Sequence, residues 1–151
     1  ALLFPMERVF ESYVAAALRR HLDSRQYRVH VQAKGKYLFE LPQKRFALRP
    51  DLVIEDLNGG APTVLDTKWK LLSPQWHNYG ISQADMYQMY AYQKEYSAKQ
   101  ALLLYPDCAA MANQETPLCY SSDSGNLVRI QTLNLEAPIA MVEVVRELLD
   151  A

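Results

Sequence analysis

Two aspartates and a lysine, Asp51, Asp66 and Lys68, lie close together in the sequence with a spacing that suits a metal-dependent hydrolytic site. Apolar runs on either side of Asn58-Gly59 indicate two strands, and this dipeptide favours a two-residue turn because both central positions need positive φ. A turn centred there pairs residues that are equidistant from it, which places Asp51 opposite Asp66. Lys68 shares a strand face with Asp66. The spacing therefore predicts two carboxylates and one ammonium group in one site.

Pro62 leaves the form of the connection open. Proline removes a hydrogen-bond donor from a strand ladder, so the two strands are joined either by the two-residue turn or by a longer loop around Gly59 and Gly60. In both cases side chains alternate along the strand, and we expect Thr67 to point away from Asp66 and Lys68.

Like charges directly opposite each other destabilise a sheet, so Asp51 and Asp66 favour a compensating cation. Their oxygen ligands suit Mg²⁺ or Mn²⁺, which also accept phosphate oxygens. We therefore expect phosphodiester hydrolysis, in which the metal lowers the pKa of an attacking water while Lys68 orients that water or neutralises developing charge. The alternative is a solvated strand face whose Asp and Lys form a weak ion pair.

Four short motifs occur in an order that resembles a known family. Arg49-Pro50-Asp51 and Asp66-Thr67-Lys68 have the form of the PD-(D/E)xK nuclease motif. Together with Phe10-Glu11 and an aromatic segment ending at Tyr92, they resemble McrC, the nuclease subunit of the McrBC modified-cytosine restriction system. The resemblance begins near Phe4. It implies an α/β fold with a restriction-endonuclease-like PD-(D/E)xK core, in which helices flank a central mixed β-sheet.

The resemblance also implies further site residues. In such nucleases an acid on the first helix completes the metal shell, and Glu11 matches it, with Glu7 as the alternative. Both acids lie at the flank of the apolar stripe of a helix that begins near Met6. Gln88 and Tyr92 match a Gln-xxx-Tyr pair beside the active site. The structural alternatives are acids that compensate the helix dipole and an aromatic helix that packs on a sheet.

The function implied by the resemblance is a metal-dependent DNA endonuclease that cuts modified DNA together with a GTP-driven McrB-like motor subunit. Double-strand cleavage would require two copies. McrC-like proteins carry an N-terminal region that engages the motor, and nothing in residues 1–151 corresponds to it, so we expect one nuclease domain that lacks this region. A stand-alone DNA repair or recombination nuclease is one alternative, and a catalytically inactive DNA-docking module is another.

The composition sets limits on these interpretations. A chain of 151 residues with 50% hydrophobic and 22% charged residues is typical of one globular domain. The net charge of −1 provides no global basic field, so DNA binding would need a local groove or a partner. Cys108 and Cys119 form neither a zinc motif nor a disulfide framework, which favours a reduced cytoplasmic setting. The absence of a long apolar run argues against membrane insertion.

The remaining elements must position this site. We expect a strand over 27–32, followed by Tyr37–Phe39 in a three-stranded meander. After the hairpin we expect a helix from Ser82 to about Tyr96, a buried strand over 100–105 parallel to the site-bearing sheet, a strand over 127–133 and a terminal helix from Pro138. Residues 106–126 are expected to be loop.

Three basic residues, Lys44, Arg45 and Arg49, precede the first aspartate. They lie at the entry to the predicted hairpin, where a phosphate could approach. The alternative is that they only solvate a surface.

Overall fold

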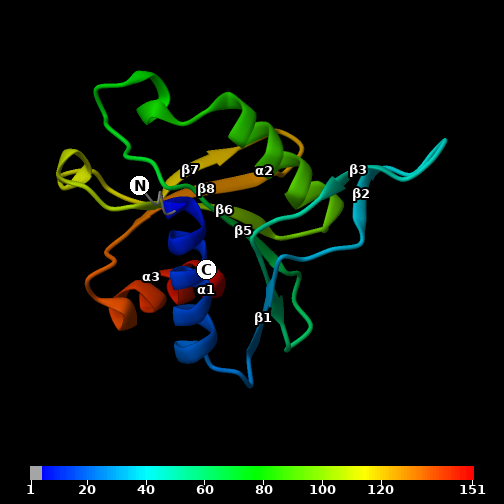
Figure 1. Cartoon of the computed structure of the whole chain (residues 1–151), viewed down its shortest axis with the longest axis horizontal. Coiled ribbons are helices and arrows are strands. Elements are labelled where there is room, and N and C mark those ends of the chain that lie inside the picture. Colours follow the sequence, from blue (N-terminus) through cyan, green and yellow to red (C-terminus); the bar gives the residue numbers. More distant parts are fainter. Residues whose placement is uncertain (1–4) are drawn as a thin grey trace.

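A six-stranded mixed sheet with helices on both faces forms the centre of the computed structural model, which describes residues 5–151 (Figure 1). Phe4, where the resemblance begins, lies outside the described residues. In spatial order the strands are β1 (Tyr27–Val31), β4 (Leu52–Asp56), β5 (Thr63–Thr67), β6 (Gln100–Pro106), β8 (Leu127–Leu133) and β7 (Leu118–Ser121). The predicted α/β fold with a mixed central sheet is confirmed.

The sheet changes direction at β5. The strands β1, β4 and β5 are antiparallel neighbours, whereas β5, β6 and β8 run parallel and β7 is antiparallel to β8. Every residue of β6 is buried, as expected of a strand that has neighbours on both sides and helices on both faces. The predicted parallel pairing after the second helix is confirmed. The edge strand β7 lies within the segment that was expected to be loop.

Alternation along the strands divides the core into two layers. Leu52, Leu65 and Leu102 face α1 (Met6–His21) and α3 (Pro138–Asp150), whereas Val64 and Leu103 face α2 (Gln83–Glu95). The helix α2 begins where the sequence predicted, because the side chain of Ser82 accepts a hydrogen bond from the amide of Asp85. None of the helices within residues 5–151 combines the length and hydropathy that a membrane span requires.

The strands β2 (Lys36–Phe39) and β3 (Arg45–Leu48) pair only with each other, so the expected three-stranded meander was wrong. The strand β1 pairs instead with β4, which places Val29 beside Ile54 against the core. Residues 34–49, here called the β2–β3 arm, therefore extend away from the main sheet (Figure 1). The arm returns to the sheet directly before Asp51.

The connection between β4 and β5 is a longer loop and not the two-residue turn. Gly59 has a φ of +92°, but Asn58 does not have the positive φ that a turn of this type needs at both central positions. Instead the amide of Asn58 donates to the Asp56 side chain and that of Gly59 to the Asp56 carbonyl. The predicted register nevertheless holds, because the loop extends equally on both sides of the same centre.

Candidate functional site

Asp51 and Asp66 meet at one end of β4 and β5. The last ladder pair is Leu52 with Leu65, so these two residues follow directly at its end. The amide of Asp51 donates to Asp66 Oδ1 over 3.0 Å, and the amide of Thr67 donates to Asp51 Oδ2 over 2.8 Å. Each carboxylate is thus held by the backbone of the opposite strand. The structure brings the two predicted aspartates together as the register requires.

Thr67 also contacts Asp51, although it lies on the opposite strand face from Asp66, as alternation predicts. Its hydroxyl donates to Asp51 Oδ2 over 2.8 Å. Asp51 lies just before β4 begins, beyond the last ladder pair, where its carboxylate can reach across the end of β5. Asp66 pairs with Leu103 and Thr67 with Leu104, which lie in opposite layers of the core, so alternation holds at this end of β5.

The Asp66 carboxyl is buried, with 4% of the residue exposed. Burial raises its pKa, the neighbouring charge of Asp51 raises it further, and Lys68 opposes both effects. The result is a pKa of about 7. Any cation that approaches this carboxyl group would stabilise its ionised form.

Lys68 supplies a positive charge beside the Asp66 carboxyl. Its Nζ lies 3.1 Å from Asp66 Oδ2 and 3.6 Å from Asp85 Oδ1. Burial lowers the pKa of Lys68, but the adjacent carboxylates, Asp66 first, more than offset this and raise its pKa above the usual value. Lys68 therefore stays protonated at neutral pH and can donate hydrogen bonds but cannot accept a proton from water.

Asp85 is a functional candidate that the sequence analysis missed. It lies in the first turn of α2, and its carboxylate lies close enough to Lys68 for an ion pair. The signal was present, because Asp85 is one turn before Gln88 and two turns before Tyr92 on the same helix face.

Tyr92 and Gln88 differ in their relation to the carboxylates. Tyr92 is buried in the α2 layer of the core, and its pKa is raised by burial and then by the charges of Asp66 and Asp51. Its ring therefore lies beside the site. Gln88 is half-buried, and within residues 5–151 its side chain makes no hydrogen bond to the site.

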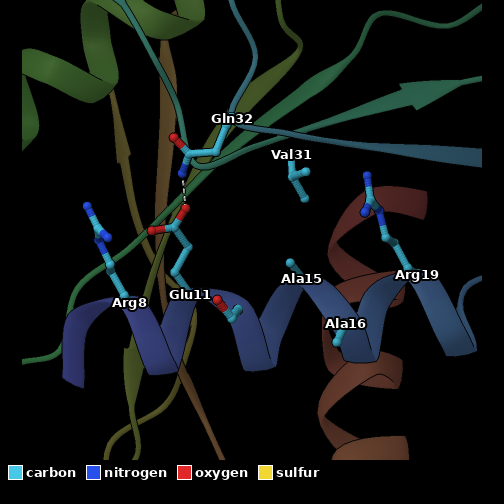
Figure 2. A pocket seen from close by; sticks show the side chains of 8 residues that line it. Arg8, Glu11, Ala15, Ala16, Arg19, Val31 and Gln32 are labelled. Carbon is cyan, nitrogen blue, oxygen red and sulfur yellow. Dashed lines mark hydrogen bonds between the residues drawn. The ribbon is translucent and has the colours of Figure 1, made fainter. Parts of the chain in front are cut away.

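Both acids of α1 reach toward the sheet. Glu7 Oε2 accepts a hydrogen bond from the amide of Trp69 over 2.7 Å, directly after Lys68. Glu11 accepts one from Gln32 and lines a surface cavity of about 520 Å³ between α1 and β1 (Figure 2). The pKa of Glu11 is raised by burial and by the charge of Asp51. Glu11 lies within reach of the charge of Asp51, and Glu7 binds the backbone next to Lys68, so the choice between Glu11 and Glu7 stays open.

Comparison with known proteins identifies the family of the chain. A family model described as "McrBC 5-methylcytosine restriction system component" matches residues 1–106, a segment that contains both aspartates and Lys68. The chain belongs to this McrBC family. The resemblance inferred from the four motifs is thus confirmed. No curated protein matches the chain.

The fold of this McrBC family member is shared with a solved structure. A chain in an assembly described as Thermococcus gammatolerans McrB AAA+ hexamers with bound McrC matches with a TM-score of 0.72 and 15% sequence identity. The match covers 95% of the present chain and 33% of that chain. The McrBC chain described here therefore spans about a third of the length of its structural relative.

The donor atoms of the McrBC site suit a hard divalent cation, although the third donor is turned away. Asp51 and Asp66 offer carboxylate oxygens beside each other, which is the ligand type that Mg²⁺ and Mn²⁺ take. Glu11 is bound to Gln32, and among residues 5–151 no group of three or more His, Cys, Asp or Glu side chains is arranged to hold a metal ion. Rotation of the Glu11 or Glu7 side chain would be needed to complete the set.

Tyr105 is a second residue that the sequence analysis missed. Its hydroxyl is buried on β6 and makes no hydrogen bond among the described residues. Its pKa is raised by burial and then by the charges of Asp85, Asp66 and Glu7, which places the hydroxyl within reach of the site's electric field. In the parallel register Thr67 pairs with Leu104, so Tyr105 follows in line with Lys68. That register could have indicated Tyr105.

Proposed function

We propose that this McrBC-family chain is a metal-dependent DNA endonuclease domain with a restriction-endonuclease-like PD-(D/E)xK core. The observation that carries this proposal is the close pair of half-buried Asp51 and buried Asp66 beside the protonated Lys68. The two carboxylates repel each other, and the single ammonium group of Lys68 does not fully offset this repulsion, because the pKa of Asp66 stays raised. A functional requirement best explains why the fold places them together.

Each residue of the proposed site has a separate task. Asp51 and Asp66 hold Mg²⁺ or Mn²⁺ together with Glu11, or with Glu7 in its place. When bound, the metal polarises the phosphoryl oxygen and lowers the pKa of an attacking water. Lys68 orients that water or stabilises negative charge on the phosphate by donating hydrogen bonds.

The α2 residues support these groups. Asp85 forms a second ion pair with the ammonium group of Lys68 and helps to hold it in place. Tyr92 closes the site on the α2 side and limits water access to Asp66, and Gln88 lies one turn away on the same helix. These residues position the site and do not take part in bond breaking.

The proposed partners follow from the family and from the solved relative. That relative is an assembly of McrB AAA+ hexamers with bound McrC. We infer that a McrB-like GTP-driven motor delivers modified DNA to this domain, and that two copies are needed to cut both strands. A net charge of −1 allows only few phosphate contacts, so the domain alone should nick DNA slowly or not at all at physiological salt.

The decisive experiment measures cleavage of methylated DNA by the assembled McrBC-type complex with GTP and Mg²⁺. The variants Lys68→Ala and Asp66→Asn should each lower the cleavage rate by a factor of about 10² to 10³ or more, as expected when a charge-stabilising group is lost. Asp56→Asn, at the other end of β4, is the matched control and should cleave like the parent.

Two results would contradict the proposal. If Lys68→Ala cleaves at the parent rate, Lys68 has no catalytic role. Rapid cutting of unmodified duplex by residues 1–151 without nucleotide would replace the partner-dependent function by that of a stand-alone nuclease.

A further inference from the structure

The β2–β3 arm carries an unusual combination of side chains. Four large apolar residues are exposed on it, including Phe39 (54% exposed), Leu41 (86%) and Phe46 (71%), and the fourth is Leu38. Soluble proteins rarely leave such a group uncovered on a projecting element unless it contacts another molecule. The arm therefore has the features of an interaction surface.

The charge of the arm indicates what kind of molecule it contacts. Five of the sixteen Lys and Arg residues lie within residues 34–49, against one acid, Glu40. The rest of the chain has eleven basic and sixteen acidic residues and is thus negative. The five basic residues are Lys34, Lys36, Lys44, Arg45 and Arg49, and all of them are exposed. Lysine is depleted at protein interfaces but common at phosphate contacts, so a polyanion fits this surface better than a second protein does.

The geometry of the arm fixes its base and exposes its tip. At the base, Leu48 is buried in the α2 layer of the core, and Lys36 Nζ lies 5.4 Å from the centre of the Tyr96 ring of α2. The two strands pair only with each other and not with the main sheet, and the tip around Leu41 projects into solvent (Figure 1). From Arg49 to Lys44 a strand reaches roughly 16 Å, comparable to the width of a DNA major groove at about 12 Å.

Backbone strain at Phe46 presents the two aromatic rings together. Phe46 has a φ of +58°, which is rare for a bulky residue and costs on the order of 1 to 3 kcal/mol. The rings of Phe39 and Phe46 pack edge to face with centres 6.0 Å apart, and both stay exposed. Strain that produces an exposed aromatic pair and not a buried one is typical of a binding element.

We propose that the β2–β3 arm is a duplex-DNA-binding element, whose basic residues contact backbone phosphates while Leu41 and the Phe39 and Phe46 pair enter a groove. The proposal rests on the proposed nuclease function for its choice of DNA. Because Arg49 lies two residues before Asp51, DNA held by the arm is directed to the carboxylate site. Apolar side chains inserted into a groove are a known means of gripping DNA without reading its sequence.

The test is a binding assay that is independent of cleavage. The 151-residue chain with Lys68→Ala, in EDTA, is titrated into a short fluorescein-labelled duplex at several salt concentrations, and anisotropy gives Kd. Adding Lys44→Ala and Arg45→Ala should raise Kd about tenfold and make the slope of log K against log salt shallower by about 2, since each lost phosphate contact removes about 0.9.

Two further variants sharpen the test. Arg20→Ala with Lys94→Ala removes the same charge from exposed positions on α1 and α2 and should leave the slope unchanged. Leu41→Ser removes no charge, so it should weaken binding several-fold without changing the slope. Thermal melting confirms that each variant is folded, as expected for changes at exposed positions.

The proposal is overturned if the arm pair and the control pair have equal Kd and slope, or if Leu41→Ser binds like the parent. It is also overturned if arm variants change the sedimentation of the DNA-free chain and leave DNA binding unaltered, because the arm would then be a protein interface. Arm-dependent binding in a chain whose Lys68→Ala variant still cleaves at the parent rate would instead count only against the proposed active site.

Discussion

An acidic side chain, Asp66, is buried at the end of β5, whereas apolar side chains are exposed on the β2–β3 arm that leads into β4. Asp66 is almost inaccessible and is bound by Lys68 and by the amide of Asp51. Leu41 and Phe46 are largely exposed to solvent. Both regions invert the usual distribution of polar and apolar groups.

The difference shows how one short segment can separate two tasks. Groups that hold a metal must be fixed to within a fraction of an ångström, and the backbone of β4 and β5 provides that rigidity. The arm, for which we propose DNA binding, is accessible and lies outside the core. Arg49-Pro50 joins the two regions and keeps them adjacent.

The largest contrast in stability should come from two leucines. Leu65 is fully buried beside Asp66, and Leu65→Ala should lower the free energy of unfolding by about 2 to 5 kcal/mol through lost burial and a residual cavity. Leu41→Ala on the arm should change it by less than about 0.5 kcal/mol. Urea denaturation measures both, and a costly Leu41→Ala would show that the arm packs against the body of the protein.

The second-largest contrast between the two regions should come from metal binding. An ion bound only by the folded state stabilises it, by about 2.7 kcal/mol at one hundred times its Kd. Millimolar Mn²⁺ should therefore raise the melting temperature of the parent and of the Lys44→Ala, Arg45→Ala arm variant alike. Asp51→Asn should remove most of the increase. An identical melting temperature with and without Mn²⁺ in the parent would argue against a metal site.

Several features of the site were predictable because they depend on spacing alone. The facing of Asp51 and Asp66 follows from the symmetry of the chain about Asn58-Gly59, which holds for the longer loop as well as for the tight turn. The buried strand β6 was evident from its unbroken apolar run. Register and burial are set by patterns that any single sequence displays.

Other features depend on contacts that spacing does not encode. The separate β2–β3 sheet was missed because its strands bury almost nothing, so no apolar pattern marks which partner they choose. Asp85 meets Lys68 only through the packing of α2 on the sheet. The hydrogen bond that Gln32 donates to Glu11 depends on a side-chain rotamer. Each requires the three-dimensional arrangement before it can be inferred.

A smaller effect concerns pH and distinguishes the buried site from the exposed arm. The pKa of Asp66 is raised to about 7 in the folded protein. At pH values between the ordinary pKa of an aspartate and about 7, the folded state therefore binds more protons than the unfolded state. The stabilising contribution of the protonated form is complete at the acidic end and is lost as pH rises through about 7.

This pH dependence can be measured against Asp66→Asn, which cannot titrate at this position. In EDTA, the stability of the parent relative to Asp66→Asn should fall between pH 5 and pH 8, as determined from urea denaturation, with the window set by the raised pKa. The arm variant Lys44→Ala, Arg45→Ala should follow the parent. If the difference in free energy of unfolding between the parent and Asp66→Asn stays constant over this pH range, the pKa of the buried Asp66 carboxyl is not raised.

The smallest effect should come from a single hydroxyl. The Tyr105 hydroxyl is buried and without a hydrogen-bond partner among the described residues, so it loses its hydration without compensation. Tyr105→Phe should therefore leave the free energy of unfolding unchanged or raise it by up to about 1 kcal/mol. On the arm, Tyr37→Phe is the matched control, because that side chain is only half-buried and should lose nothing measurable. If Tyr105→Phe instead destabilises the protein by more than about 1 kcal/mol, the hydroxyl is hydrogen-bonded through water, and the buried site is better hydrated than its side chains indicate.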